Sequence, residues 1–139
     1  MKGGVPTKLK KLVVDSFRRH AWYMGVAHYT ADILYMEENK SRGDTSHTLA
    51  EIDVNRRYLT CTLRIFPITV ERWKSLGDYV VEDVIAHETA HIVTQHLRDC
   101  AGARYVEQPE VDDAWESLTE SISRISLKLD KELKKSNRE

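Results

Sequence analysis

The sequence predicts one α+β domain: an N-terminal helix, a small and mostly antiparallel sheet of about three strands, and two C-terminal helices. Apolar residues recur with helical spacing near both ends of the chain, and they alternate with polar residues in between. A length of 139 residues is that of one domain, so residues 1–139 are taken as a single unit. About residues 1–6 and 134–139 are expected to be flexible.

The first helix is expected over residues 7–24. Its inward-facing positions recur every three or four residues, with Lys and Arg between them: Leu9, Leu12, Val13, Phe17 and His20. Gly25 follows directly and suits the left-handed conformation in which many helices end.

Three strands are expected over residues 29–37, 50–54 and 59–65, because apolar or aromatic residues alternate with polar ones in each. The short stretch 55–57 predicts a hairpin turn between the second and third strands. The polar stretch 38–46 is expected to be a loop, and Pro67 is expected to end the third strand.

Two helices are expected to close the chain. The first, over residues 78–99, is apolar on nearly all sides, which is typical of a buried helix. The second begins near Pro109, a residue that fits the first turn of a helix. One apolar stripe runs along this last helix: Val111, Trp115, Leu118, Ile122, Ile125, Leu129 and Leu133.

The composition excludes several classes of protein. With 41% hydrophobic and 31% charged residues, the chain does not belong to the intrinsically disordered class. No run of 18 apolar residues predicts a membrane span, and the N-terminal segment does not resemble a signal peptide. The net charge of −1 gives no reason to expect a nucleic acid or membrane partner. Cys61 and Cys100 are expected to be reduced thiols of a cytoplasmic protein.

The segment with the clearest chemistry is an HExxH motif formed by His87, Glu88 and His91. On a helix, the two histidines lie four residues and about 40° apart, so both imidazoles point the same way and can bind one Zn²⁺ ion. Glu88 is turned about 100° from His87, where a general base for a metal-bound water should stand. The alternative is a pair of core histidines that bond to backbone carbonyls.

A catalytic zinc site usually takes three protein ligands, so a third ligand is expected elsewhere. His96 lies on the opposite side of the helix from the motif. If the last helix runs antiparallel, Glu116 and Glu120 lie about 9 and 15 Å from the connection, and the histidines about 12 and 18 Å from it. Asp113 stays within about 5 Å of the turn. We predict Glu116 as the third ligand and Glu120 as an acceptor for a histidine N–H, with Glu120, Asp113 and His96 as alternative ligands.

The motif HETAH, followed 25 residues later by Glu116 in the segment WESLTE, resembles the gluzincin branch of the zincin metallopeptidases. In thermolysin-like members the later motif reads NExxSD, and Trp115 stands here in place of the Asn. The chain also resembles minimal gluzincins and small phage-type metallopeptidases. The resemblance implies a zincin-like fold with a buried HExxH helix, a C-terminal ligand helix and one zinc ion.

The expected function is that of a zinc metallopeptidase, a hydrolase acting on a peptide or protein substrate with Glu88 as general base. Tyr105 is a candidate donor to the oxyanion, and the sheet near residues 60–66 is a candidate edge for binding an extended substrate. One alternative is a non-catalytic, zinc-binding structural or assembly protein of a phage or mobile element. Another is a regulatory protease of the ImmA type that acts on a repressor. The oligomeric state is not predicted.

Overall fold

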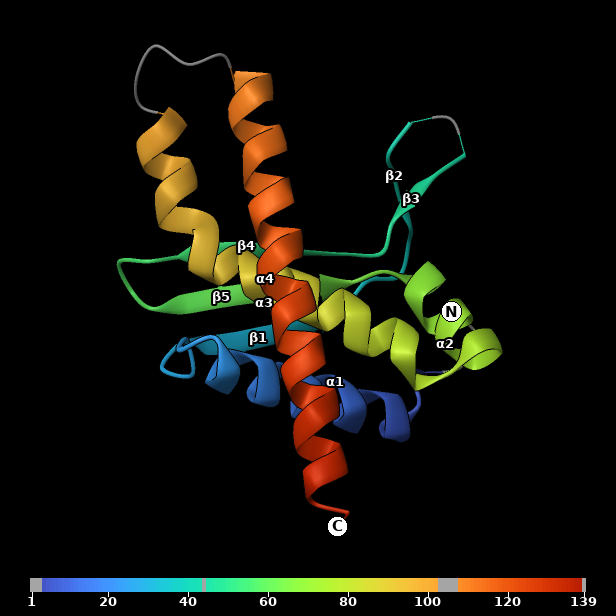
Figure 1. The fold of residues 1–139 in the computed structure, drawn as a ribbon. Coiled ribbons are helices and arrows are strands. Elements are labelled where there is room, and N and C mark those ends of the chain that lie inside the picture. Colours follow the sequence, from blue (N-terminus) through green and yellow to red (C-terminus); the bar gives the residue numbers. More distant parts are fainter. Residues whose placement is uncertain (1–3, 44, 103–107, 139) are drawn as a thin grey trace.

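The computed structural model describes residues 4–43, 45–102 and 108–138. It has the predicted α+β architecture, with an N-terminal helix, a small sheet and long C-terminal helices (Figure 1). The helices and strands follow in the order α1 (Thr7–Tyr23), β1 (Thr30–Tyr35), β2 (Lys40–Ser41), β3 (His47–Thr48), β4 (Ala50–Asn55), β5 (Thr60–Ile65), α2 (Pro67–Leu76), α3 (Asp78–Gly102) and α4 (Gln108–Ser136).

The main sheet is mixed, which corrects the prediction of a mostly antiparallel sheet. Its strand order is β1-β5-β4, with β4 and β5 antiparallel and β1 and β5 parallel. The hairpin between β4 and β5 was predicted because it is local. The parallel pair joins strands that are about 30 residues apart, from Thr30 opposite Thr60 to Tyr35 opposite Ile65. The alternation of apolar residues does not encode which strand lies beside which.

Because β5 is the central strand, residues 60–66 do not provide the open edge that we expected. Both edges of β5 are paired, and β4 and β1 are the outer strands of the main sheet. Among the described strands, the outer edge of β4 has no neighbour in that sheet. This edge lies on the side of α3 and α4.

Two features of the structure were not predicted, namely the β2–β3 ribbon and the helix α2. The β2–β3 ribbon pairs Lys40 with Thr48 and Ser41 with His47, within and beside the predicted loop 38–46. Pro67 ends β5 and is also the first residue of α2. That position suits proline because its missing N–H would have no partner in the first turn of a helix.

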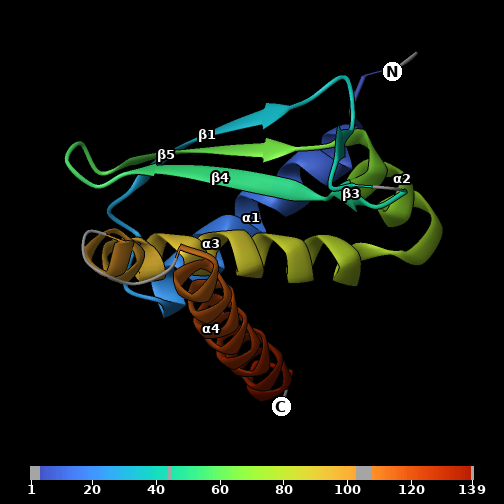
Figure 2. The same ribbon diagram turned by 90° about the horizontal axis from the view of Figure 1, so that it is seen from above.

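The helices α1 and α3 cover one face of the main sheet, and α4 lies against α3 on the side away from the sheet (Figure 2). The core forms where these layers meet. Its larger apolar side chains with no exposed surface include Leu9, Val13, Leu63 and Ile85. These come from α1, β5 and α3. The middle of α3 is buried as its sequence predicted, whereas Val93 and Leu97 nearer its end are 37% and 55% exposed.

The side of α4 that packs on the rest of the protein is mostly polar. Its buried residues are Val111, Thr119, Ser123, Ser126 and Asp130. Much of the predicted apolar stripe faces outward instead, with exposed fractions of 38–67% at Leu118, Ile125, Leu129 and Leu133. Hydrogen bonds explain this orientation, because Ser126 Oγ lies 2.5 Å from Nδ1 of His20 in α1 and Asp130 accepts a bond of 2.9 Å from Tyr23.

Candidate metal centre

The HExxH motif lies in the middle of α3, between the sheet and α4 (Figure 2). The apolar residues that surround the motif hold this helix in the core. Val81, Ile85, Ala86 and Ala90 are each at most 1% exposed. A polar side chain on such a helix needs a partner inside the protein, because water is excluded there. The partners of the two motif histidines come from α4.

The ligand-type atoms of His87, Glu88 and His91 lie within 4.8 Å of one another, so these residues form a candidate metal-binding triad. The two imidazole rings are 4.8 Å apart between centroids and nearly perpendicular, at 86°. His91 and Glu88 are buried, and His87 is partly exposed. The triad is therefore open to solvent on the side of His87.

The carboxylate of Glu116 lies against both histidines. Its Oε2 is 3.2 Å from Nε2 of His87, and its Oε1 is 3.3 Å from Nε2 of His91. Two ligands bound to zinc at about 2.0–2.1 Å in a tetrahedral arrangement are themselves about 3.3–3.4 Å apart. Each of these two separations therefore matches the distance between two ligands of one small cation.

The other ring nitrogen of each histidine has its own partner on α4. Nδ1 of His87 lies 2.7 Å from Oε2 of Glu120, and Nδ1 of His91 lies 3.3 Å from Oγ1 of Thr119. Thr119 is in turn bonded to Thr94 of α3, at 2.8 Å. When Nδ1 carries the proton and donates it to such a partner, Nε2 is left with a free lone pair. In metal sites, bonds of this kind orient the ring of a histidine ligand.

Trp115, the residue before Glu116, packs on the same site. The ring centroid of Trp115 is 4.3 Å from that of His91. The guanidinium of Arg98 lies over the Trp115 ring, 4.1 Å from its centroid. The planes of the His91 and Trp115 rings are tilted by 41°, and the indole packs against the buried imidazole from one side. This contact gives a packing role to the position at which the sequence departs from the thermolysin-like pattern.

Burial keeps two groups of the site neutral when no cation is present. It lowers the pKa of His91 to about 3, with smaller contributions in the same direction from His87 and Arg98. Burial also raises the pKa of Glu88 to about 8, and the charge of Glu116 adds to that shift. The contact between His91 and Glu116 is therefore not an ion pair at neutral pH. A neutral imidazole is the form that binds a metal.

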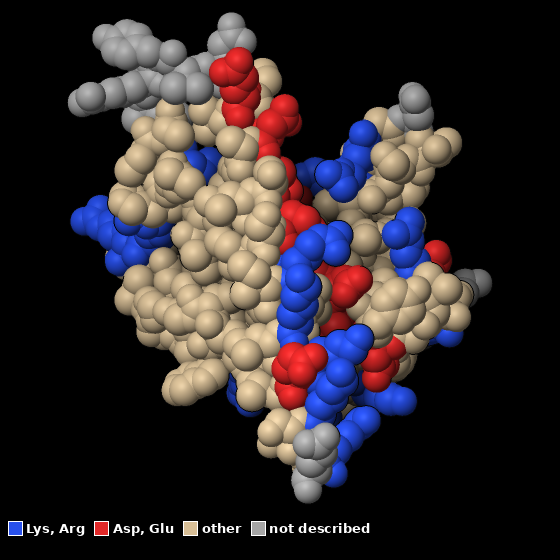
Figure 3. Space-filling view, in the orientation of Figure 1, with Lys and Arg blue, Asp and Glu red and all other residues tan. Residues whose placement is uncertain are grey.

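A cavity of about 510 Å³ opens over these side chains. Figure 3 shows the surface hollowed between α4 and the β2–β3 ribbon, with both acidic and basic side chains along α4 and basic ones toward the ribbon. One wall is formed by α3 and α4 and includes His87, Glu88, His91, Glu116 and Glu120. The opposite wall is formed by Arg42 and by the start of β4 with the residues before it, 48–52. The motif can therefore be reached by a ligand that lies along β4.

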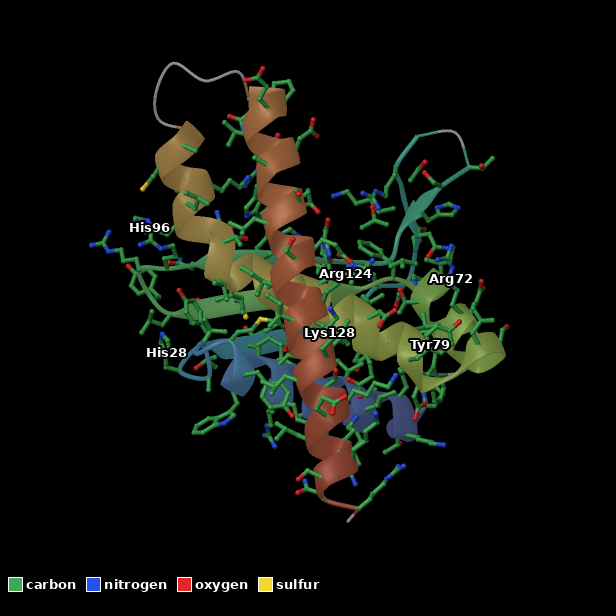
Figure 4. All side chains as sticks on the ribbon, in the orientation of Figure 1. His28, Arg72, Tyr79, His96, Arg124 and Lys128 are labelled. Carbon is green, nitrogen blue, oxygen red and sulfur yellow. The ribbon has the colours of Figure 1, made fainter. Side chains whose placement is uncertain are left out.

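The alternative ligands lie away from the motif. His96 is exposed on the side of α3 away from α4 (Figure 4), and its Nδ1 is 3.5 Å from Sγ of Cys100. Asp113 is exposed and does not line the cavity. Tyr105 lies outside the described residues. Cys61 and Cys100 are both free, as expected, and burial raises the pKa of the Cys61 thiol to about 11.

A second polar cluster, which the sequence did not reveal, lies where α1, α3 and α4 meet. It contains His20, Glu82 and Asp130, whose ligand-type atoms also lie within 4.8 Å of one another. Its carboxylates are already bound by cationic side chains: Arg19 bonds to both, and Lys134 lies 3.0 Å from Asp130. This cluster therefore links the three helices through ion pairs and does not need a metal ion to balance its charge.

Burial on its own would raise the pKa of Glu82, but polar contacts with His20, Ser16 and Arg19 lower it to about 2. Ser16 donates a bond of 2.8 Å to Oε2 of Glu82, whereas Nε2 of His20 lies 3.5 Å from the same oxygen. Glu82 therefore stays ionised throughout the neutral range and holds α1 against α3. The residues of this cluster are too far apart in the sequence for any motif to reveal it.

No helix in the described part of the chain is long and apolar enough to cross a membrane. No family model matches the sequence, and no curated protein or solved structure matches it either. The function must therefore be inferred from the site itself, which is a group of His and Glu side chains able to hold a metal ion.

Proposed function

We propose that the protein is a zinc-dependent metallopeptidase, with His87, His91 and Glu116 as ligands of one zinc ion. The observation that carries this proposal is the position of Glu116, whose two carboxylate oxygens lie 3.2 and 3.3 Å from Nε2 of the two histidines. Two imidazoles and one carboxylate are a ligand set that zinc takes in hydrolytic enzymes.

Three protein ligands favour a catalytic over a structural role for the ion. A structural zinc site is closed by four protein ligands, whereas a catalytic site keeps one position for water or substrate. Among the described residues that line the cavity, no further His or Cys is present to close the site. The cavity also gives a substrate access to the side of the motif where that open position would be.

Glu88 is the proposed general base. When bound, a zinc ion would acidify a water molecule and polarise the peptide carbonyl that the water attacks. The carboxylate of Glu88 would take a proton from the water as the water oxygen bonds to the peptide carbon. It would then give this proton to the leaving amine as the peptide C–N bond breaks. In the metal-free protein, burial holds the pKa of Glu88 at about 8, and a cation nearby would lower it and favour the basic carboxylate.

The proposed substrate is an extended peptide bound beside β4. The outer edge of β4 is unpaired in the described sheet, and residues 50–52 of this strand line the cavity next to Glu88. A peptide segment can add to such an edge through main-chain hydrogen bonds. Whether the natural substrate is a repressor, as in proteases of the ImmA type, stays a prediction.

The test combines zinc content with peptide cleavage. Protein equilibrated with zinc and freed of unbound metal should hold one ion per chain and cleave casein or a mixed peptide library. Glu88→Gln should retain zinc and lose cleavage, whereas Glu116→Ala should lose most of the zinc. Glu110→Ala, on the exposed first turn of α4, is the matched control and should change neither. Zinc bound with no cleavage of any substrate would refute the peptidase assignment.

One observation favours the second candidate function, a non-catalytic zinc protein that takes part in an assembly. The apolar residues Leu118, Ile125, Leu129 and Leu133 are exposed along one side of α4, and large exposed apolar patches often mark contact surfaces. In that case the Glu88→Gln variant and the wild type would bind zinc equally and neither would cleave peptides.

A further inference from the structure

Arg42, beside the β2–β3 ribbon, is a charged residue of the cavity that has no part in the proposed reaction. The charged residues that line the cavity are Arg42, Glu51, Asp83, Glu88, Glu116, Glu120 and Arg124. Several of them are already paired with one another or with neighbours. Among residues 4–43, 45–102 and 108–138, no ion pair involving Arg42 is present.

Three of the five acidic residues that line the cavity have charged or imidazole partners among the described residues. Glu51 of β4 lies 2.7 Å from Nζ of Lys40 and 3.7 Å from Arg64. Glu120 binds Arg124 at 3.1 Å as well as His87 at 2.7 Å. The carboxylate of Glu116 faces the two motif histidines. Among the described residues that line the cavity, Asp83, Glu88 and Arg42 have no ion pair, so the cavity offers a ligand one guanidinium that is free to bind it.

The backbone holds Arg42 in place at the mouth of the cavity. Its N–H donates a bond of 2.9 Å to the carbonyl of Ser46, across the end of the ribbon. The ion pair between Lys40 and Glu51 ties the same ribbon to β4. The guanidinium is thus carried by a ribbon fixed to the strand along which a peptide would lie. Basic side chains on this side of the hollow are visible in Figure 3.

Arg42 and Glu88 line the same cavity of about 510 Å³. Glu88 lies in α3 and Arg42 on the opposite wall. A substrate between these walls would therefore have its scissile bond near Glu88 and a neighbouring side chain near the guanidinium.

Building on the peptidase function proposed above, we propose that Arg42 is a specificity-determining residue that selects peptides with an Asp or Glu side chain close to the scissile bond. A guanidinium presents paired N–H donors that match the two oxygens of a carboxylate. A basic side chain at the same place would meet the like charge of Arg42. An uncharged one would leave the guanidinium to water.

The experiment uses the zinc-loaded full chain and pairs of peptides that differ only by Glu, Gln or Lys at one position. The positions within three residues of the cleaved bond are tested in turn. At one of them the wild type should prefer Glu over Gln by about fivefold in kcat/KM, the scale of a partly exposed ion pair. Arg42→Glu should reverse the order and favour Lys. Arg72→Glu is the control, since Arg72 of α2 lies outside the cavity (Figure 4) and should leave the preference unchanged.

A second measurement separates binding from chemistry. The inactive, zinc-loaded Glu88→Gln variant should bind the Glu peptide more tightly than the Gln peptide, and adding Arg42→Glu should abolish that difference. Equal kcat/KM for all peptides in a wild type that does cleave would overturn the specificity inference alone. A fall in kcat/KM in Arg42→Glu that is the same for every peptide would also overturn the specificity inference alone. Absence of Glu88-dependent cleavage from every peptide would overturn the peptidase function and the inference with it.

Discussion

Replacing Glu120 tests whether a carboxylate on α4 orients one of the metal-binding histidines. Oε2 of Glu120 lies 2.7 Å from Nδ1 of His87, a length typical of a charge-assisted hydrogen bond. Removing such a partner from a metal-ligating histidine typically costs 10–100-fold in metal affinity. Because the side chain of Glu120 is 44% exposed, water screens part of the interaction. We therefore expect Glu120→Ala to weaken zinc binding by about 10–30-fold.

The affinity is measured by competition with a chromophoric zinc chelator at fixed pH. Glu120→Gln keeps an acceptor but loses the charge, so its affinity should fall between those of the wild type and Glu120→Ala. Glu132→Ala is the control, because Glu132 lies on the same helix and is exposed beside Lys135. An affinity for Glu120→Ala equal to that of the control would refute the reasoning that Glu120 supports His87.

Three further predictions concern stability. The folded-state pKa of Glu82 is about 2, below its ordinary value of 4.5, so its stabilising effect should be complete above pH 4.5 and decline as the pH falls toward 2. Urea unfolding at several pH values should show a smaller decline in stability for Glu82→Gln than for the wild type. An equal dependence of stability on pH in the two proteins would contradict this. Asp130→Ala removes one buried carboxylate partner of Arg19, which stays bound to Glu82. This change should lower the free energy of unfolding, measured in urea, by about 2–3 kcal/mol. A loss below about 1 kcal/mol would argue against a role of this polar cluster in holding the helices together. Ile125 is 67% exposed, so Ile125→Ser should change the free energy of unfolding by less than about 0.5 kcal/mol. Leu63→Ala, in the core, should lower it by about 2–5 kcal/mol, and thermal melting measures both. Equal losses of stability in the two variants would contradict the orientation of α4.

The features that could be predicted from sequence are those set by local spacing. The helix that carries HExxH, the hairpin joining β4 and β5 and the start of α4 near Pro109 depend on residues a few positions apart. The same holds for the distances along two antiparallel helices, which predicted that Glu116 and Glu120 would reach the depth of the motif. The structure places both carboxylates against the histidines, and their roles as ligand and supporting acceptor stay predictions.

The features that could not be predicted depend on partners far apart in the sequence. The parallel pairing of β1 with β5 is one, since either strand alone has the same alternation as an antiparallel strand. The buried polar side of α4 is another, because Ser126 and Asp130 find their partners on α1, more than 100 residues away. Without those partners, an apolar stripe is the side that a helix is expected to bury.

The position of Arg42 was also hidden from sequence analysis. It lies within a polar stretch that predicts a loop, and only the pairing of β2 with β3 brings it over the cavity. A lone basic residue in such a stretch is usually exposed to solvent and has no special role. The role proposed for Arg42 depends on the residues of α3 and α4 that form the opposite wall of the cavity.

The central claim is that one divalent ion is held by His87, His91 and Glu116. Its most direct test is the zinc stoichiometry of protein equilibrated with zinc and then freed of unbound metal. The wild type should retain one ion per chain, whereas His91→Ala, checked by circular dichroism for an intact fold, should retain almost none. A wild type that retains no zinc, or a folded His91→Ala variant that retains as much as the wild type, would contradict the claim.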